Sequence, residues 1–440
     1  MTNFSFFPEK RVFDFQESLY ESLFSIDNLE LNTSYLNVFL KIGYVPSNLT
    51  LFNNIKLFDP NNKALTAHFS SLPEYSHDVS TLKDLMLSSI AEGYESKAIQ
   101  VVPLSGGMDS RIVLAALCEF TETKNINTYT FGVPGSYDYE IPNQIAKKLG
   151  TKHTNFTSKK TNYTIDGLIR AAIASDGNTE IFHPLVLNRV SDHYGPNAIY
   201  WSGFAGDLVG GAFGDKLIGN NSKQQLIDYE KRGIHFLEGI VEDKSIYSYI
   251  SLGEKMGSYI SEAEACFWEN HVERYTGHHI FRNDMNIKAP LVDTRILKFF
   301  FTLPKSQREN KKFFNESFAS IYPKIFDIPT KDYGYKYSRY FYKQPFRKAR
   351  FYSKAIGWRL APKLITHADT AYIDMQHAIN ERPDVKNCID ELLSDLSHRN
   401  IIDNKRMFKF LSQHREGSKN YTKDIINLAS LEVILKAANS

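Results

Sequence analysis

The feature that most constrains the fold of this chain is a regular alternation of apolar, strand-like runs and helical spans between residues 80 and 202. The expected strands are residues 99–104, 127–131, 153–156 and 198–202. The expected helices between them are residues 109–120 and 139–149, followed by helical spans to about residue 194. Connections of this length suit parallel strands joined by right-handed crossovers. The alternation therefore predicts an α/β fold with a doubly wound parallel sheet.

The regions on either side of this alternation have different patterns. Up to about residue 75, β-prone runs such as residues 49–58 lie between turn clusters of Pro, Asn, Asp and Ser, which predicts a small β-rich segment. From about residue 223 the periodicity is almost wholly helical. We interpret residues 1–78 as one small unit and residues 79–440 as one domain, whose helical C-terminal continuation packs on the sheet.

Composition narrows the class of protein. Of the 440 residues, 42% are hydrophobic and 23% are charged, as in an average globular chain. The net charge of +2 argues against a dedicated nucleic-acid-binding protein. No apolar run reaches the ~18 residues of a membrane-spanning helix, and the first residues lack a secretory signal pattern. Cys118, Cys266 and Cys388 are far apart and form no disulfide framework, so we expect a cytoplasmic protein.

A glycine-rich loop at the first strand–helix junction carries the clearest chemical signal. Residues 105–110 read Ser-Gly-Gly-Met-Asp-Ser, directly after an apolar strand and directly before a helix. Adjacent glycines allow a sharp turn whose N–H groups converge on an anion, and the helix N-terminus adds a positive dipole end. The carboxylate of Asp109 fits such a site if Mg²⁺ lies between it and a phosphate. The alternative is a plain turn in which Asp109 caps the helix.

This loop resembles the S-G-G-x-D-S pyrophosphate loop of the N-type ATP pyrophosphatases, enzymes that attack the α-phosphate of ATP to form an acyl-adenylate. Further segments resemble the asparagine synthetase family in the same order along the chain, and together the resemblance covers about residues 35–334. These segments are residues 128–132 with Asp138 beyond them, residues 202–207, and residues 290–293 followed by Leu303 and Pro304.

The resemblance implies a domain of the ATP-pyrophosphatase type with ATP and Mg²⁺ as cofactors. The residues it assigns to the ATP and pyrophosphate site are Leu104, Ser105, Gly106, Gly107, Asp109, Ser110, Phe131, Ser202 and Gly203. Asp109 and Asp207 would share the Mg²⁺ ion. For Asp207 the alternative is a turn aspartate in a glycine-rich loop, and for Phe131 it is a core residue.

The family also places a catalytic lysine on a loop beyond the helix that ends in Leu-Pro. The candidates here are Lys331 and Lys336, and Lys331 is slightly favoured. The ammonium of such a lysine would neutralise charge on the α-phosphate as the adenylate forms and breaks. An ordinary exposed loop lysine is the alternative for each of them.

The chain departs from the family at three places. Glutamine-hydrolysing members begin with a catalytic cysteine at position 2, where this chain has Thr2, and no cysteine precedes Cys118. We therefore interpret residues 1–78 as a degenerate remnant of a glutaminase-like domain and expect no glutaminase activity. Phe204 stands where the family has a glutamate that handles the proton of the incoming amine, and Leu208 replaces an acidic residue.

The expected function is that of an ATP-dependent, AMP-forming ligase that makes amide bonds. A small-molecule or lipid-linked carboxylate would be activated as an acyl-adenylate, with release of pyrophosphate, and captured by ammonia or an amine that another protein could supply. Surface-polysaccharide assembly and natural-product biosynthesis are the two settings considered. The alternatives are an idle nucleotide-binding partner of an amidotransferase and a peptide macrocyclase of the lasso-cyclase type. The basic, aromatic stretch 336–363 suggests either peripheral membrane contact or a solvated basic face.

Overall fold

The structure is a computed structural model of the 440-residue chain. It describes residues 12–13, 19–20, 22–57, 69–212, 221–253, 259–331, 353, 356 and 373–440. The predicted site residue Lys336 lies outside the described residues, as does the stretch 336–363 apart from residues 353 and 356.

Five parallel strands form the main sheet of the described part of the chain, in the order β6-β5-β4-β7-β8. The strands are β4 Gln100–Pro103, β5 Ile126–Gly132, β6 Lys152–Thr157, β7 Ile199–Trp201 and β8 Asn286–Lys288. The central strand β4 is the first of the five along the chain, and successive strands are added on one side and then on the other. This order confirms the predicted doubly wound parallel sheet and makes the carboxyl end of β4 the point where the connections diverge, which is where ligands bind in such sheets.

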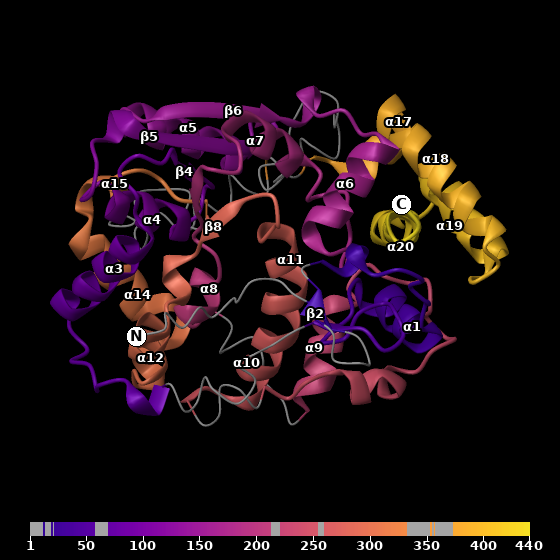
Figure 1. Ribbon diagram of the computed structural model, residues 1–440, viewed down its shortest axis with the longest axis horizontal. Coiled ribbons are helices and arrows are strands. Elements are labelled where there is room, and N and C mark those ends of the chain that lie inside the picture. The colour runs from indigo at the N-terminus through magenta and orange to yellow at the C-terminus, as the bar shows by residue number, and fades with distance from the viewer. Residues whose placement is uncertain are drawn as a thin grey trace.

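Helices cover both faces of the sheet (Figure 1). Val102 of β4 and Trp201 of β7 belong to the hydrophobic cluster that contains residues of α3, α4 and α5, whereas Val101 and Tyr200 point to the other face, into a cluster with residues of α7. The bounds of these helices are α3 Val79–Gly93, α4 Asp109–Leu117, α5 Tyr137–Leu149 and α7 Val186–Tyr194.

The described residues between β7 and Lys331 are largely helical, as predicted. Its helices are α8 Gly206–Val209, α9 Ser222–Glu230, α10 Glu262–Phe267, a π-helix Trp268–Thr276, α11 Gly277–Ile280, α12 Thr294–Phe301, α13 Lys305–Arg308, α14 Lys312–Ile321 and α15 Pro323–Phe326. Strand β8 was not predicted. It has three residues and a single apolar side chain, Ile287, so it shows no periodicity of its own and exists because the edge of β7 is available for pairing.

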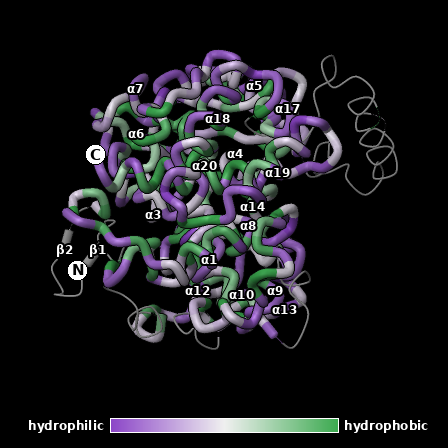
Figure 2. Tube along the Cα trace, turned by 90° about the vertical axis from the view of Figure 1, so that its right-hand side faces the viewer, coloured by the Kyte–Doolittle hydropathy of each residue, from purple (hydrophilic) through white to green (hydrophobic). Residues whose placement is uncertain are grey.

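A second hydrophobic cluster joins the N-terminal residues to the end of the chain. Helix α6 (Ile165–Ser175) packs against α20 (Thr422–Ala437), and α20 also contacts α1 (Thr33–Ile42). The remaining members are α17 Met375–Glu381, α18 Pro383–His398 and α19 Asn404–Arg415. Figure 1 shows these helices on the side of the molecule away from α3 and α4, and Figure 2 shows apolar stretches in green around α20 in the interior.

The N-terminal segment is less purely β than expected. Its strands β1 Val12–Phe13, β2 Leu19–Tyr20 and β3 Lys56–Leu57 form a small antiparallel sheet, but the ten-residue helix α1 lies between β2 and β3. Asn32 caps that helix by accepting hydrogen bonds from the N–H groups of Ser34 and Tyr35, and Gly43 ends it in the left-handed region. The β-prone run 49–58 does contain a strand, β3, whereas helix α1 was not predicted.

Among the described residues, no helix combines the length and the apolar character needed to cross a membrane.

Candidate active site

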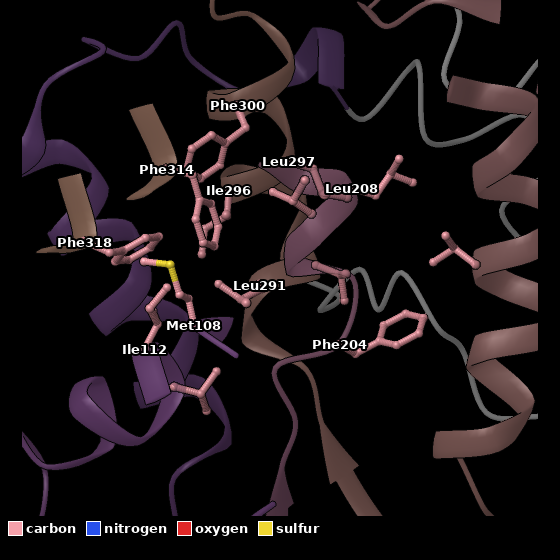
Figure 3. Packing of buried hydrophobic residues seen from close by; sticks show 14 of the residues in the cluster. Met108, Ile112, Phe204, Leu208, Leu291, Ile296, Leu297, Phe300, Phe314 and Phe318 are labelled. Carbon is pink, nitrogen blue, oxygen red and sulfur yellow. The ribbon is translucent and has the colours of Figure 1, made fainter. Parts of the chain in front are cut away.

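The glycine-rich loop lies at the carboxyl end of β4, and hydrogen bonds from within the loop shape it. The N–H of Ser105 donates to Oγ of Ser110 at 3.2 Å, and the N–H of Gly107 donates to Oγ of Ser105 at 3.2 Å. Met108 anchors the loop, since its side chain is buried in the core and extends toward Ile112 and Phe318 (Figure 3). Asp109 follows as the first residue of α4.

Asp138, at the start of α5, holds the other side of the loop. Its Oδ1 accepts a hydrogen bond from the N–H of Gly106 at 2.7 Å, and its Oδ2 lies 3.4 Å from Nζ of Lys331. The backbone N–H of Lys331 in turn donates to the carbonyl oxygen of Gly106 at 2.8 Å. The structure therefore brings Lys331, one of the two predicted lysines, against the phosphate loop.

Arg111 explains why the segment before Lys331 docks here. This fully buried guanidinium donates to the loop carbonyls of Gly107 (2.8 Å) and Gly106 (3.2 Å). It also donates to the carbonyls of Ile328 (3.1 Å) and Pro329 (3.0 Å). One side chain thus ties the loop to the lysine-bearing segment, a role that the sequence analysis did not assign to Arg111.

A second turn, between β7 and α8, packs directly on the first. A Cβ atom on Gly203 would lie 2.6 Å from the backbone nitrogen of Ser110, and one on Gly206 would lie 2.4 Å from Cγ of Asp109. Only glycine permits this approach at either position. The close contact brings Asp207, the first residue after Gly206, beside Asp109, as the resemblance implied.

The position between these two aspartates is taken by Lys311, which the sequence analysis did not single out. Its Nζ lies 2.7 Å from Oδ1 of Asp109 and 2.8 Å from Oδ1 of Asp207. Burial alone would lower the pKa of this ammonium, but the charges of Asp109 and Asp207 outweigh burial and hold the pKa above its ordinary value. At pH 7 Lys311 is therefore a cation that balances the two carboxylates.

Most of the predicted site residues line one cavity of about 690 Å³. They are Leu104, Ser105, Gly107, Asp109, Ser110, Phe131, Ser202, Gly203, Asp207 and Lys331. Gly106 is in the loop but does not line the cavity. Phe131 lines the cavity and also packs edge-on against Tyr129, with ring centroids 5.2 Å apart.

The end of the cavity beyond the loop is lined by a column of rings on one long helix. Phe267, His271, Tyr275 and His279 follow each other at four-residue steps through α10, the π-helix and α11, with neighbouring ring centroids 4.5 to 5.3 Å apart. A π-helix bonds residue i to residue i+5, and its wider turn suits such a column. The rings give this end of the cavity an aromatic wall with imidazole nitrogens.

Buried carboxylates hold these imidazoles. Nδ1 of His271 lies 2.5 Å from Oε1 of Glu230, and Nε2 of His279 lies 3.2 Å from Oε1 of Glu180. His183, which also lines the cavity, pairs with Glu180. Burial opposes ionisation of Glu180, but His183 and His279 lower its pKa overall; burial likewise opposes the charged form of His183, but Glu180 raises its pKa overall.

Phe204 and Leu208, two of the three departures from the family pattern, are both buried cavity-lining residues. The ring of Phe204 packs edge-on against Phe281 at 5.1 Å, and Figure 3 shows both side chains on the turn and helix that follow β7. Neither can accept a proton, whereas the histidines and Tyr275, among the described residues at this end of the cavity, can exchange one.

The carboxylates of Asp109 and Asp207 suit a hard cation, because both already converge on one positive charge. The described residues contain no group of three or more His, Cys, Asp or Glu side chains that could hold a metal ion. Two carboxylates leave room for phosphate oxygens and water, which is how Mg²⁺ is usually held at a nucleotide. The residues therefore fit Mg²⁺ bound together with a phosphate ligand.

Part of the chain is similar to known proteins. Residues 81–178 match the family model described as asparagine synthase. A protein of Methanocaldococcus jannaschii, provisionally named glutamine-hydrolysing asparagine synthetase 2, is 23% identical over 150 residues. That alignment covers 30% of this chain and 29% of the relative's length. The family match includes the phosphate loop and Asp138, whereas Asp207, Lys311 and Lys331 lie beyond it.

Proposed function

We propose that this chain, whose residues 81–178 match the asparagine synthase family model, is an ATP-dependent ligase that forms an amide bond by way of an acyl-adenylate. A carboxylate substrate attacks the α-phosphate of ATP, pyrophosphate leaves, and an amine then displaces AMP from the activated acid. The observation that supports this most directly is the convergence of Asp109 and Asp207, from two strand ends, on one cation position at the rim of the cavity.

In this proposal the residues around the loop bind and orient the nucleotide. Ser105 and Ser110 supply hydroxyl donors to the pyrophosphate portion, with Gly107 allowing close approach. The adenosine lies along Leu104, Phe131, Ser202 and Gly203, which line the cavity beside the loop. When bound, Mg²⁺ would be held by Asp109 and Asp207 and would neutralise phosphate charge. Lys331, already in contact with the loop, would stabilise charge that develops on the α-phosphate.

The aromatic and histidine-lined end of the cavity would hold the acid and the incoming amine. We assign the amine's proton to His271, since Glu230 holds its Nδ1 and the ring faces the cavity. A carboxylate that fixes one ring nitrogen orients the other for proton transfer. This pair would take over the task for which Phe204 is unsuited.

Ammonia or another amine, rather than glutamine, is the proposed nitrogen source. The name of the Methanocaldococcus protein describes that protein as glutamine-hydrolysing, but the present chain aligns with only 29% of its length. The first 117 residues of this chain contain no cysteine. Surface-polysaccharide and natural-product pathways both remain proposed settings for such a reaction.

One observation favours a second candidate, an idle nucleotide-binding protein that partners an amidotransferase. Phe204 and Leu208 are buried and apolar at positions where the family pattern has acidic side chains. A chain of this kind would bind ATP through the same loop but would activate no acid.

Exchange of labelled pyrophosphate into ATP separates the two candidates. The purified chain is supplied with ATP, Mg²⁺ and candidate acids from three classes: sugar acids, amino acids and linear peptides. An acid-dependent exchange that Asp109→Asn abolishes in a folded protein supports the ligase. ATP binding without exchange for any acid in the panel supports the idle partner, and unchanged Mg²⁺-dependent ATP affinity in Asp109→Asn would remove Asp109 from the site.

A further inference from the structure

Lys311 occupies the position that a divalent cation shared by Asp109 and Asp207 would take. A single Nζ atom lies within 2.8 Å of one oxygen from each carboxylate. Its side chain is 10% exposed, compared with 19% for Asp109 and 66% for Asp207, so the lysine is the enclosed member of the group. The Lys311–Asp109 contact is therefore enclosed, whereas Asp207 reaches the same ammonium from a largely exposed position.

The backbone around Lys311 is built to deliver this ammonium. Asn310 and Lys311 have φ angles of +55° and +57°, two consecutive non-glycine residues in the left-handed region. Such residues persist only where their surroundings fix them. Arg308, three residues earlier, pairs with the buried Glu264, and the Lys311 ammonium lies 4.5 Å from the ring centroid of Phe314. The disfavoured turn between α13 and α14 thus serves to aim one side chain at the aspartates.

The carboxylates of Asp109 and Asp207 need a neighbouring cation both without and with a bound metal ion. Two carboxylates this close repel each other, and a partly buried charge left without a partner is strongly unfavourable. Lys311 supplies one positive charge in the state described here. A bound Mg²⁺ ion would supply two, and it would leave the Lys311 ammonium without its partners unless another anion were close by. The phosphates of ATP are such an anion.

We propose that Lys311 is a built-in counter-cation that holds the metal position closed until Mg²⁺ arrives with ATP, and that its ammonium then transfers to the phosphates. The proposal rests on the ATP-dependent function proposed above. It makes metal and nucleotide binding cooperative, because a metal ion that arrives alone displaces Lys311 from both aspartates and brings no anion to receive its ammonium. The role differs from that of Lys331, whose acid partner is Asp138.

The proposal predicts how the full chain binds a metal ion without nucleotide. The probe is Mn²⁺, followed by electron paramagnetic resonance titration. The wild-type chain is expected to bind Mn²⁺ weakly, whereas Lys311→Met, which keeps the apolar stem over Phe314 but removes the charge, is expected to bind it about ten-fold more tightly or better. Lys311→Gln is a second variant in case the thioether disturbs packing. The same lysine-to-methionine change at the exposed neighbour Lys312 is the matched control and is expected to match the wild type.

The location of the gained metal is checked by adding Asp207→Asn to Lys311→Met, which is expected to remove the gain. With a non-hydrolysable ATP analogue present, the wild type is expected to bind Mn²⁺ tightly. The factor by which the analogue increases the Mn²⁺ affinity is expected to be about ten-fold smaller in Lys311→Met than in the wild type. Equal nucleotide-free Mn²⁺ affinities in the wild type and in folded Lys311→Met and Lys311→Gln variants would overturn the counter-cation role alone. Failure of the wild type to bind the Mn²⁺ complex of the analogue would instead overturn the proposed function.

Discussion

Lys331 contacts the same loop as Lys311 but has its own acid, Asp138, and a more exposed side chain. An ammonium that stabilises charge on the α-phosphate contributes more to the transition state than to the bound substrate. We predict that Lys331→Ala lowers the turnover number of acid-dependent ATP–pyrophosphate exchange by about 10² to 10³ and changes ATP affinity little. Arginine should rescue poorly, because its planar fork does not reproduce a compact ammonium.

Two other lysines serve as controls for this prediction. One is Lys336, the second candidate from the sequence, and the other is the exposed Lys324. Lys336→Ala and Lys324→Ala should keep most of the exchange rate. An inactive Lys336→Ala beside an active Lys331→Ala would reverse the assignment.

His271 is the residue to which we assign the proton of the amine. The substitution His271→Gln removes a group that can accept a proton but keeps a polar side chain of similar length. We expect pyrophosphate exchange to persist and amide formation to fall by about 10² to 10⁴, the usual contribution of general acid–base catalysis. Product quantification by mass spectrometry beside the exchange assay gives both rates. Equal losses in the two assays would mean that His271 shapes the cavity and takes no proton.

The loop and its strand were predictable from sequence at the level of elements, because glycines, an apolar strand and a helix follow one another within a few residues. The positions of Lys311 and Arg111 were not. Lys311 lies in a charged run, residues 308–312, that reads as an exposed turn, and only the fold brings it beside Asp109. Arg111 lies within α4, where a basic residue ordinarily reaches solvent. Long-range contacts, which local patterns do not encode, decide both.

Arg111 holds two segments of the chain together, and a substitution there can test how much this contributes to stability. It joins the loop before α4 to the segment after α15 through hydrogen bonds to backbone carbonyls of both. We predict that Arg111→Met lowers the free energy of unfolding by at least about 2 kcal/mol, because several buried carbonyls lose their donor. Denaturant titration measures this loss. Arg111→Lys keeps the charge but not the planar guanidinium, so its free energy of unfolding should lie between those of the wild type and Arg111→Met. If Arg111→Met is as stable as the wild type, the carbonyls have found other donors.

At the scale of the whole molecule, a segment far away in the sequence supports the wall of the cavity. Glu230, which holds His271, also accepts a hydrogen bond at 3.1 Å from the hydroxyl of Tyr44, a residue of the N-terminal segment. Burial, followed by the charge of Glu230, raises the pKa of Tyr44, so the hydroxyl stays protonated and donates. The residues interpreted from sequence as a remnant therefore support the wall of the cavity.

The pair of Glu180 and His183 makes the stability of this wall depend on pH. The pKa of His183 is raised from 6.5, so its contribution to stability is complete below pH 6.5 and is lost as the pH rises through the folded-state pKa. The pKa of Glu180 is lowered from 4.5, so its contribution is complete above pH 4.5 and is lost as the pH falls through its folded-state pKa. The pair should therefore stabilise the fold most between about pH 4.5 and 6.5.

Melting temperatures of the wild type and Glu180→Gln across pH 4 to about 9 test this dependence. The difference between them should be largest within that window and shrink as the pH rises. Glu238→Gln is the matched control, since Glu238 forms an exposed pair with His235 at the same three-residue spacing. A difference that stays constant over the whole range would contradict the assigned charge states.

The packing of α20 against both α1 and α6 also governs how the chain can fold during translation. Residues 33–42 are synthesised early, but the helix that covers their apolar face, residues 422–437, emerges only near the end. At about 5 to 20 residues per second, that interval is on the order of tens of seconds. Throughout that interval Phe39 and its neighbours lack the cover of α20, so we expect part of this apolar face to stay exposed until synthesis reaches residue 437.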